Sequence, residues 1–317
     1  MRFTATCQQA HDPIHRRKLL NLKHRCRYHV KSNVRTPVSD INRYFVLINP
    51  DRYGLFLTMD LKEYTQFSEL AVKTRHPWES ARAEVIRLLM GSILSEGDNK
   101  TVLDVGCGDC FVISRLHRAW PECQYVGVDS ALTEEFMAGF HAEHRDIDLK
   151  LTTEFNDANF NDVFDLALIL DVLEHVPDDK AFLKDIVSAL NPGSQVLITV
   201  PAHPALFCSH DRWLGHCRRY TRKGLVDLIQ NAGLRITRQG YFFSLLLVPR
   251  LLICVAEKMG WRRRLEDNGI GRWQGGKRLS RWISYILYCN AHVDILLSKL
   301  RLPHLGLSCY VLCQKSP

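Results

Sequence analysis

The segment from Thr101 to Cys110 places the strongest constraint on the fold of this chain. It reads Thr-Val-Leu-Asp-Val-Gly-Cys-Gly-Asp-Cys, so an apolar run typical of a buried strand leads directly into a turn that contains Gly106 and Gly108. Glycine has no Cβ atom and adopts left-handed dihedral angles, which allows backbone N–H groups to approach a bound molecule closely. A helical pattern begins at Phe111 and ends at Pro121. The order of strand, glycine turn and helix predicts an α/β protein with a ligand site at this turn.

A second strand is predicted at Gln124–Val128, and it ends on Asp129, 25 positions after Asp104. A carboxylate at the tip of this strand can accept hydrogen bonds from ribose hydroxyls, as in doubly wound nucleotide-binding folds. The dinucleotide motif Gly-x-Gly-x-x-Gly needs a third glycine where Phe111 stands, so NAD is disfavoured. The glycines alone are equally consistent with a turn that binds no ligand.

The turn resembles the first motif of class I S-adenosylmethionine-dependent methyltransferases, an acidic residue followed by Gly-x-Gly-x-Gly. Asp104 and the two glycines match this motif, and Cys110 occupies the position of its third glycine. The resemblance implies that S-adenosylmethionine is the cofactor and that Asp129 binds its ribose. The turn residues that would contact the cofactor are Asp104, Gly106, Cys107 and Gly108.

Two further segments resemble the same family in the same order. Residues 164–176 are similar to its fourth strand and the following loop, and Leu190–Pro201 is similar to a helix end, a turn and the fifth strand. The implied fold is a doubly wound, mostly parallel, seven-stranded sheet of the Rossmann-like type, with a helical insertion before the last strand. The family also implies cofactor contacts for Asp171, at the end of the fourth strand, and for Asp157, after a predicted third strand at Leu149–Thr152.

Positive charge is concentrated at the N-terminal end of the chain. The formal net charge is +8, yet residues 1–58 hold 11 Lys and Arg against 3 Asp and Glu, and residues 59–317 hold 31 of each. Since the body of the chain has no basic excess, nucleic acid is not expected as a partner. Residues 1–58 are interpreted as a basic extension outside the fold, either a disordered or membrane-tethering arm or a mis-assigned start with translation beginning at Met59. Residues 59–317 are predicted to form the methyltransferase domain, with the insertion at 242–300.

The cysteine pattern favours a reducing compartment. Eleven cysteines, an odd number without paired or metal-ligand spacing, are typical of free thiols and predict a cytoplasmic protein. Cys107 and Cys110 do form a Cys-x-x-Cys pair, so a redox or metal role is the alternative. Both fall inside the cofactor turn and no second pair accompanies them, which favours a packing role.

Three polar residues are expected at the edge of the sheet where cofactor and acceptor would meet. They are Asp171, Glu174 and His175, directly after the predicted fourth strand. His175 is a candidate general base near neutral pH, and the alternative is that it only orients the loop. The three side chains also offer metal ligands, but neighbouring carboxylates are common at strand tips without a metal, and none is predicted.

Residues 203–220 are dense in polar and aromatic side chains and are the predicted acceptor-binding wall. His210 and His216 are further candidates for the catalytic base, and Asp211 is placed to orient one of them. Thr221 is predicted to cap the next helix.

The run Gly-His-Cys-Arg-Arg-Tyr-Thr at 215–221 resembles a Gly-His-x-Arg-Arg-Tyr block found in a subset of the family, often associated with biosynthesis of glycans, lipids or quinone-like compounds. This resemblance implies acceptor contacts for Arg218, Arg219 and Tyr220, through bidentate binding of a carboxylate or phosphate by an arginine. The alternative is that an arginine pairs with Asp211 inside the loop.

The insertion contains two apolar segments. Phe242–Ala256 is interrupted by Pro249 and Arg250 and is too short to span a membrane. Arg281–Leu300 has an amphipathic helical pattern. The two predicted helices form either a lid or dimer face, or a platform for an apolar acceptor with a basic edge at Trp261–Arg264, which would place the protein peripherally at the inner membrane face.

The predicted activity is methyl transfer from S-adenosylmethionine to a small-molecule or lipid- or glycan-linked acceptor, at oxygen. For such a reaction the protein aligns the acceptor, excludes water and supplies a base for the hydroxyl proton. Two alternatives stay open: a scaffold protein that binds S-adenosylmethionine without catalysis, and an NAD-linked oxidoreductase, which Phe111 disfavours.

Overall fold

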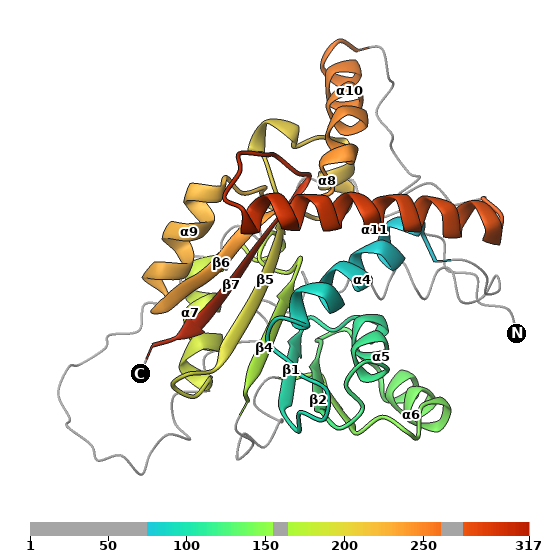
Figure 1. Ribbon diagram of the computed structural model, residues 1–317, viewed down its shortest axis with the longest axis vertical. Coiled ribbons are helices and arrows are strands. Elements are labelled where there is room, and N and C mark those ends of the chain that lie inside the picture. The colour runs from blue at the N-terminus through green and yellow to red at the C-terminus, as the bar shows by residue number, and fades with distance from the viewer. Residues whose placement is uncertain (1–74, 155–163, 261–274, 317) are drawn as a thin grey trace, which may run out of the picture. The chain divides into compact units, whose positions relative to one another are not determined.

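A computed structural model describes residues 75–154, 164–260 and 275–316. Seven strands form one sheet in the order β3-β2-β1-β4-β5-β7-β6 (Figure 1). Their pairings are parallel except for those of β7, which runs antiparallel to both β5 and β6. This confirms the mostly parallel, seven-stranded sheet. The strands are β1 (Thr101–Val105), β2 (Gln124–Val128), β3 (Leu149–Thr152), β4 (Leu166–Leu170), β5 (Gln195–Pro201), β6 (Leu234–Phe242) and β7 (Ser308–Lys315).

The helices of the described residues connect or flank these strands. Thr221 caps α9 by accepting a hydrogen bond from the Gly224 N–H at 3.0 Å, as predicted. The helices are α4 (Pro77–Met90), α5 (Phe111–His117), α6 (Glu134–Glu143), α7 (Asp179–Ala189), α8 (Ser209–Trp213), α9 (Arg222–Asn231), α10 (Leu247–Lys258) and α11 (Lys277–Lys299), with short 3-10 turns at Pro204–Leu206 and Ser244–Leu246.

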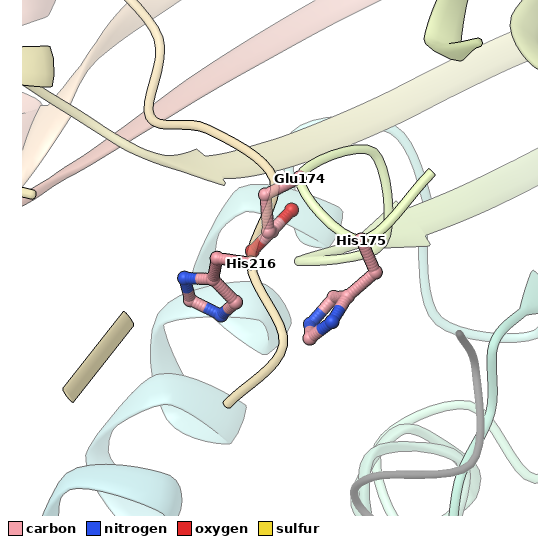
Figure 2. Close-up of side chains that lie close together, drawn as sticks. All are labelled: Glu174, His175 and His216. Carbon is pink, nitrogen blue, oxygen red and sulfur yellow. The ribbon is translucent and has the colours of Figure 1, made fainter. Parts of the chain in front are cut away.

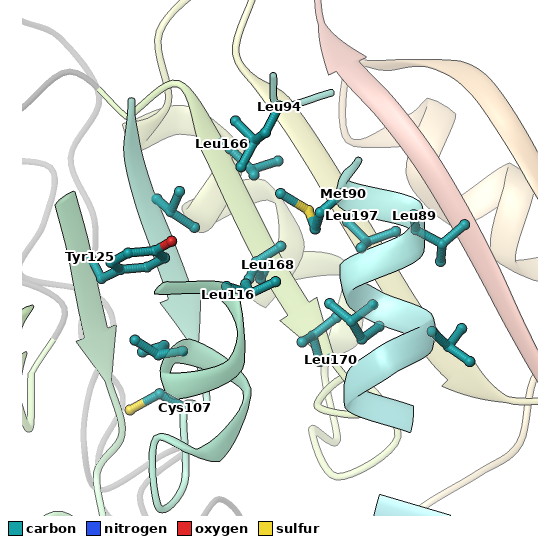
Figure 3. Packing of buried hydrophobic residues seen from close by; sticks show 14 of the residues in the cluster. Leu89, Met90, Leu94, Cys107, Leu116, Tyr125, Leu166, Leu168, Leu170 and Leu197 are labelled. Atoms are coloured by element: carbon teal, nitrogen blue, oxygen red, sulfur yellow. The ribbon is translucent and has the colours of Figure 1, made fainter. Parts of the chain in front are cut away.

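Helices cover both faces of the sheet, which is why β4 is apolar throughout and fully buried. Alternate side chains of β4 enter two cores: Ile169 packs with α7 and α9, while Leu168 packs with α4, α5 and α11. Figure 3 shows Leu89 and Met90 of α4 beside Leu168 and Leu197 in the second core.

The insertion differs from its prediction in one respect. Pro249 does not interrupt the helix, because α10 begins at Leu247 and a proline in the first turn leaves no intrahelical N–H bond unmade. The other predicted helix is α11, which packs against α4 and β6. None of the helices in the described ranges is long and apolar enough to cross a membrane. The predicted basic extension at 1–58, the start of the domain at 59–74 and the basic edge at 261–264 lie outside the described residues.

Candidate active site

The glycine turn after β1 has the backbone geometry that its sequence requires. Gly106 and Gly108 have φ angles of 77° and 54°, in the left-handed region that favours glycine. The Gly108 N–H donates to Asp129 Oδ2 at 3.0 Å, and the Ala131 N–H donates to the other oxygen of that carboxylate at 2.9 Å. The turn is therefore joined to the tip of β2 through the Asp129 carboxylate.

Cys110 takes the left-handed conformation at the position of the third motif glycine. Its φ angle is 61°, and its side chain is buried, so the cysteine adopts a backbone conformation that costs a non-glycine residue about 1 kcal/mol or more. Hydrogen bonding to Cys110 and burial raise the pKa of the Cys107 thiol. Both thiols are free and buried, which agrees with a packing role for this pair.

Asp104 is a buried carboxyl group beside the turn. It is only 2% exposed, and its Oδ1 atom has no hydrogen-bond partner within the described part of the chain. Burial raises its pKa to about 7, the Asp129 charge adds to this effect, and Arg82 opposes it. An unsatisfied buried oxygen next to the glycine turn fits a ligand that carries N–H or hydroxyl donors, as S-adenosylmethionine does.

Asp171, at the end of β4, is held by its neighbours. Its φ angle is 56°; its Oδ1 accepts from the Thr199 hydroxyl at 3.0 Å, and its Oδ2 lies 2.8 Å from Arg82 Nε. Arg82 also donates to the Leu170 carbonyl at 2.8 Å. Both carboxylate oxygens of Asp171 thus contact protein groups. The structure does not group Asp171 with Glu174 and His175 as a set of metal ligands.

Sequence reasoning missed Arg82, although a signal was present. Arg82 is half-buried and falls on the apolar stripe of α4, at helical spacing from Val85, Ile86 and Leu89. Those three apolar side chains are buried. A lone arginine on such a stripe usually has a buried partner. Here the partner is the Asp171 carboxylate, so Arg82 fixes the loop that carries His175.

His175 and His216 come together although they are distant in the sequence. Their ring centroids are 4.7 Å apart with the planes nearly perpendicular, and Figure 2 shows both rings beside the Glu174 carboxylate. The Cys217 N–H donates to the Glu174 carbonyl at 2.7 Å, which ties the loop after β4 to the segment after α8. Burial, His216 and Arg82 lower the pKa of His175 to about 3, and its Nδ1 is buried without a hydrogen-bond partner in the described ranges. His175 is therefore a neutral imidazole at physiological pH.

The same three side chains offer one carboxylate oxygen and two imidazole nitrogens within 4.8 Å of one another. This donor set suits a divalent transition metal. It differs from the set considered from the sequence, because His216 takes the place of Asp171.

Asp211 is completely buried at the first turn of α8. Its Oδ1 lies 3.2 Å from His216 Nδ1 and accepts from Arg219 Nε at 2.8 Å, while its Oδ2 accepts from the Cys208 N–H at 2.8 Å and pairs with Arg250 of α10. Burial raises the pKa of Asp211, but these hydrogen bonds and the two arginine charges outweigh it and hold the pKa below its usual value. An ionised carboxylate only accepts, so Nδ1 of His216 donates in this contact, and Nε2 is the ring nitrogen that remains for another partner.

The remaining predicted residues take up other positions. His210 is outside the His175–His216 pair; it stacks on Trp213, and burial with the Arg250 charge lowers its pKa to about 4. Asp157 lies outside the described residues.

The arginines and the tyrosine of the 215–221 block form its internal frame. Arg219 is buried, and besides Asp211 it contacts the Ala202 carbonyl at 3.1 Å. Tyr220 is also buried, with its hydroxyl 2.7 Å from Asp179 Oδ2. The sequence predicted that these two side chains contact the acceptor. In the structure their polar atoms instead bond to other groups of the protein. Arg218 is half-buried and pairs with Asp179 at 2.7 Å.

Comparison with known proteins identifies the fold and the family. A family model described as a methyltransferase domain matches residues 75–239, just over half of the chain. The structure of the [4+2]-cyclase SpnF superposes with a TM-score of 0.50 at 15% identity, covering 84% of this chain and 96% of that one, which shows the fold alone.

Two curated relatives carry the name ubiquinone biosynthesis O-methyltransferase. The protein of Ruegeria pomeroyi is 30% identical over 159 residues, which are 45% of this chain and 63% of the relative. That of Aeromonas salmonicida is 25% identical over 162 residues, 47% of this chain and 66% of the relative. The chain therefore spans less than two thirds of either relative. From the family match and the glycine-turn architecture, the chain belongs to the methyltransferase domain family of class I S-adenosylmethionine-dependent enzymes.

Proposed function

We propose that this protein transfers a methyl group from S-adenosylmethionine to a hydroxyl of a small-molecule or lipid- or glycan-linked acceptor. The observation that carries the proposal is the arrangement of His216, oriented by the buried Asp211 carboxylate and paired with neutral His175. The names of the two relatives, which specify O-methyl transfer, support the choice of oxygen.

The loop that carries His175 lies at the same edge of the sheet as the cofactor turn, and His216 pairs with His175 there. β1 and β4 are parallel neighbours, with Val105 opposite Ile169, so the turn after β1 and the loop after β4 leave the sheet side by side. Asp104, the two turn glycines and Asp129 would hold the cofactor there. When bound, S-adenosylmethionine supplies a methyl group that its sulfonium makes electrophilic.

The protein groups then handle the acceptor proton. His216 Nε2 takes the hydroxyl proton, and the Asp211 carboxylate stabilises the imidazolium that results, as an orienting acid does in a catalytic triad. His175, with its pKa lowered to about 3, stays neutral and does not repel this charge. We further propose a cytoplasmic location, supported by the free thiols of the described cysteines, and no nucleic-acid partner.

Binding and turnover test this proposal in sequence. Calorimetry of the full chain should show binding of S-adenosylmethionine and S-adenosylhomocysteine but not of NADH. Methyl-labelled S-adenosylmethionine, offered with a panel of catechols, sugars and a bacterial lipid extract, should then label an acceptor oxygen. Binding without labelling of any acceptor would favour the scaffold alternative, and NADH binding would favour the oxidoreductase. Labelling should persist in EDTA; loss with EDTA and recovery with a divalent metal would instead make Glu174, His175 and His216 a metal site.

A further inference from the structure

Every exposed large hydrophobic side chain of the described residues lies between Leu245 and Leu305. Six of these side chains follow helical spacing along α11 and its C-cap residue, and we call them the α11 stripe: Trp282, Tyr285, Ile286, Val293, Leu296 and Leu300. Trp282 is 67% exposed and Leu300 is 60% exposed. At 1.5 Å per residue the stripe is about 27 Å long. A continuous exposed apolar face of this length marks an interaction surface.

The opposite face of α11 is already occupied. Leu287, Ala291 and Ile295 are buried against the sheet, and the Ser284 hydroxyl donates to the Pro77 carbonyl of α4 at 3.0 Å. Figure 1 shows α11 running beside α4. The α11 stripe is therefore the outer face of a helix whose position the core fixes.

Within the described residues 275–316, the exposed charged side chains are all basic. Lys277, Arg278 and Arg281 are exposed at the start of α11, and Lys299 and Arg301 are exposed at its end. The one acidic residue in 275–316 is Asp294, which is 1% exposed and accepts from the Ser244 N–H at 2.9 Å. An apolar stripe with basic residues at both ends is complementary to an anionic lipid surface.

A surface hollow adds a place for a lipid headgroup. It has a volume of about 290 Å³ and is lined by Arg278, Arg281, Trp282 and Tyr285. Two guanidinium groups can bind a phosphate, and tryptophan and tyrosine favour the boundary between headgroups and acyl chains.

We infer that the α11 stripe seats this protein on an anionic lipid bilayer. A second copy of the chain is a poorer occupant, because both ends of the stripe are basic and either orientation of two paired helices sets like charges together. α10 also carries exposed apolar side chains, among them Val248, Leu252 and Val255, but Lys258 is its only exposed charged residue. The charge argument therefore rests on α11. The inference is independent of methyl transfer, since docking needs neither cofactor nor acceptor.

Vesicle flotation of the full chain tests the inference. The protein should float with vesicles of phosphatidylcholine and phosphatidylglycerol, and much less with phosphatidylcholine alone or at high salt. Residues 1–58 are also basic and could bind anionic vesicles themselves. Variants of α11 therefore test whether the binding comes from the α11 stripe. Arg278→Ala/Arg281→Ala should weaken binding roughly tenfold or more, since each basic residue near an anionic surface contributes about fivefold. Trp282→Ser/Val293→Ser should weaken it comparably.

The matched control is Lys180→Ala/Lys184→Ala, which removes the same charge from exposed positions of α7 on the other face of the sheet. This variant should bind within about twofold of the parent, because its lysines lie away from the stripe. Thermal unfolding should show that all three variants are folded, since every changed residue is exposed. The inference would be overturned if binding survived in both α11 variants, or if the control variant lost binding equally. It would also be overturned if sedimentation showed a dimer that Trp282→Ser/Val293→Ser dissociates. None of these outcomes would decide whether the protein transfers methyl groups.

Discussion

The Arg250 guanidinium of α10 pairs with the Asp211 carboxylate of α8, and both side chains are buried. The same carboxylate holds His216 Nδ1 at 3.2 Å. The insertion helix α10 is thereby connected, through one acidic side chain, to the candidate catalytic base. Ser209 reinforces the connection, since its backbone N–H donates to Glu257 of α10 at 3.0 Å. The insertion, which lies beyond the residues that the family model matches, thus takes part in positioning the site.

Replacing Asp211 with asparagine is expected to destabilise the protein strongly. The change leaves the Arg219 and Arg250 charges buried without their counter-charge, and breaking a buried pair in this way costs about 3–5 kcal/mol. Urea unfolding at neutral pH measures the loss. Asp227→Asn on α9, an exposed position, is the charge-matched control and should change stability by less than about 0.5 kcal/mol. Equal effects of the two substitutions would show that the buried cluster contributes nothing beyond charge.

His216→Gln is expected to lower kcat by about 10²–10⁴-fold, the usual contribution of a general base. The affinity for S-adenosylhomocysteine should stay within about twofold, because His216 contacts the acceptor side of the proposed site. His175→Gln provides the comparison and should lower kcat less than His216→Gln does. The reason is that the Asp211 carboxylate bonds to His216 and not to His175. A larger loss for His175→Gln than for His216→Gln would reverse the assignment of the base.

Local patterns were enough to predict much of the sheet. The ends of β2 and β3 agree with the predicted strands, and Thr221 caps α9, because alternation of apolar residues and turn chemistry are encoded within a few neighbouring positions. Arg219 pairs with Asp211, which was the alternative to an acceptor contact, and the Tyr220 hydroxyl bonds to Asp179, a partner that tertiary packing chooses.

Partnerships across the fold were the part that the sequence could not reveal. Arg82 meets Asp171 because α4 lies over β4, and Arg250 meets Asp211 because α10 packs against α8. Both pairs join residues that are distant along the chain, so no local sequence spacing predicts them. The pairing of His175 with His216 has the same origin, and from the sequence the two were only separate candidates.

Asp104→Asn is expected to change stability in a pH-dependent way. The folded protein binds a proton at Asp104 with a pKa of about 7, against a usual value of 3.8. Folding therefore disfavours the ionised form, so the parent loses stability as the pH rises between these two values. Asparagine does not ionise, so the variant should gain stability relative to the parent between about pH 5 and pH 8, by about 2–3 kcal/mol.

Urea unfolding at both pH values measures this difference in the absence of cofactor. Asp227→Asn serves as the control, since an exposed carboxyl group should produce no such trend. The affinity of the Asp104→Asn variant for S-adenosylhomocysteine should fall, because the substitution removes a carboxylate oxygen proposed to face the ligand. A stability difference that is the same at both pH values would contradict the raised pKa.

Gly127→Ala is expected to destabilise the protein and weaken cofactor binding together. A Cβ atom at this position of β2 would lie 2.9 Å from Cys107 Sγ and 2.8 Å from Leu151 Cδ2, both closer than ordinary contact. Overpacking of this kind costs about 1–3 kcal/mol. Since Cys107 belongs to the glycine turn, the strain reaches the backbone proposed to hold the cofactor.

A double-mutant cycle with Cys107→Ala separates the two contacts. Removing the sulfur should recover part of the stability lost in Gly127→Ala, because the contact with Leu151 remains. Gly139→Ala on α6 is the matched control: nothing lies within 4 Å of its added Cβ, and alanine in a helix should stabilise by about 0.5–1 kcal/mol relative to glycine. If the changes in unfolding free energy of the two substitutions were strictly additive, the Cys107 side chain would not be in steric contact with the added Cβ atom. The turn would then be free to move away from β2.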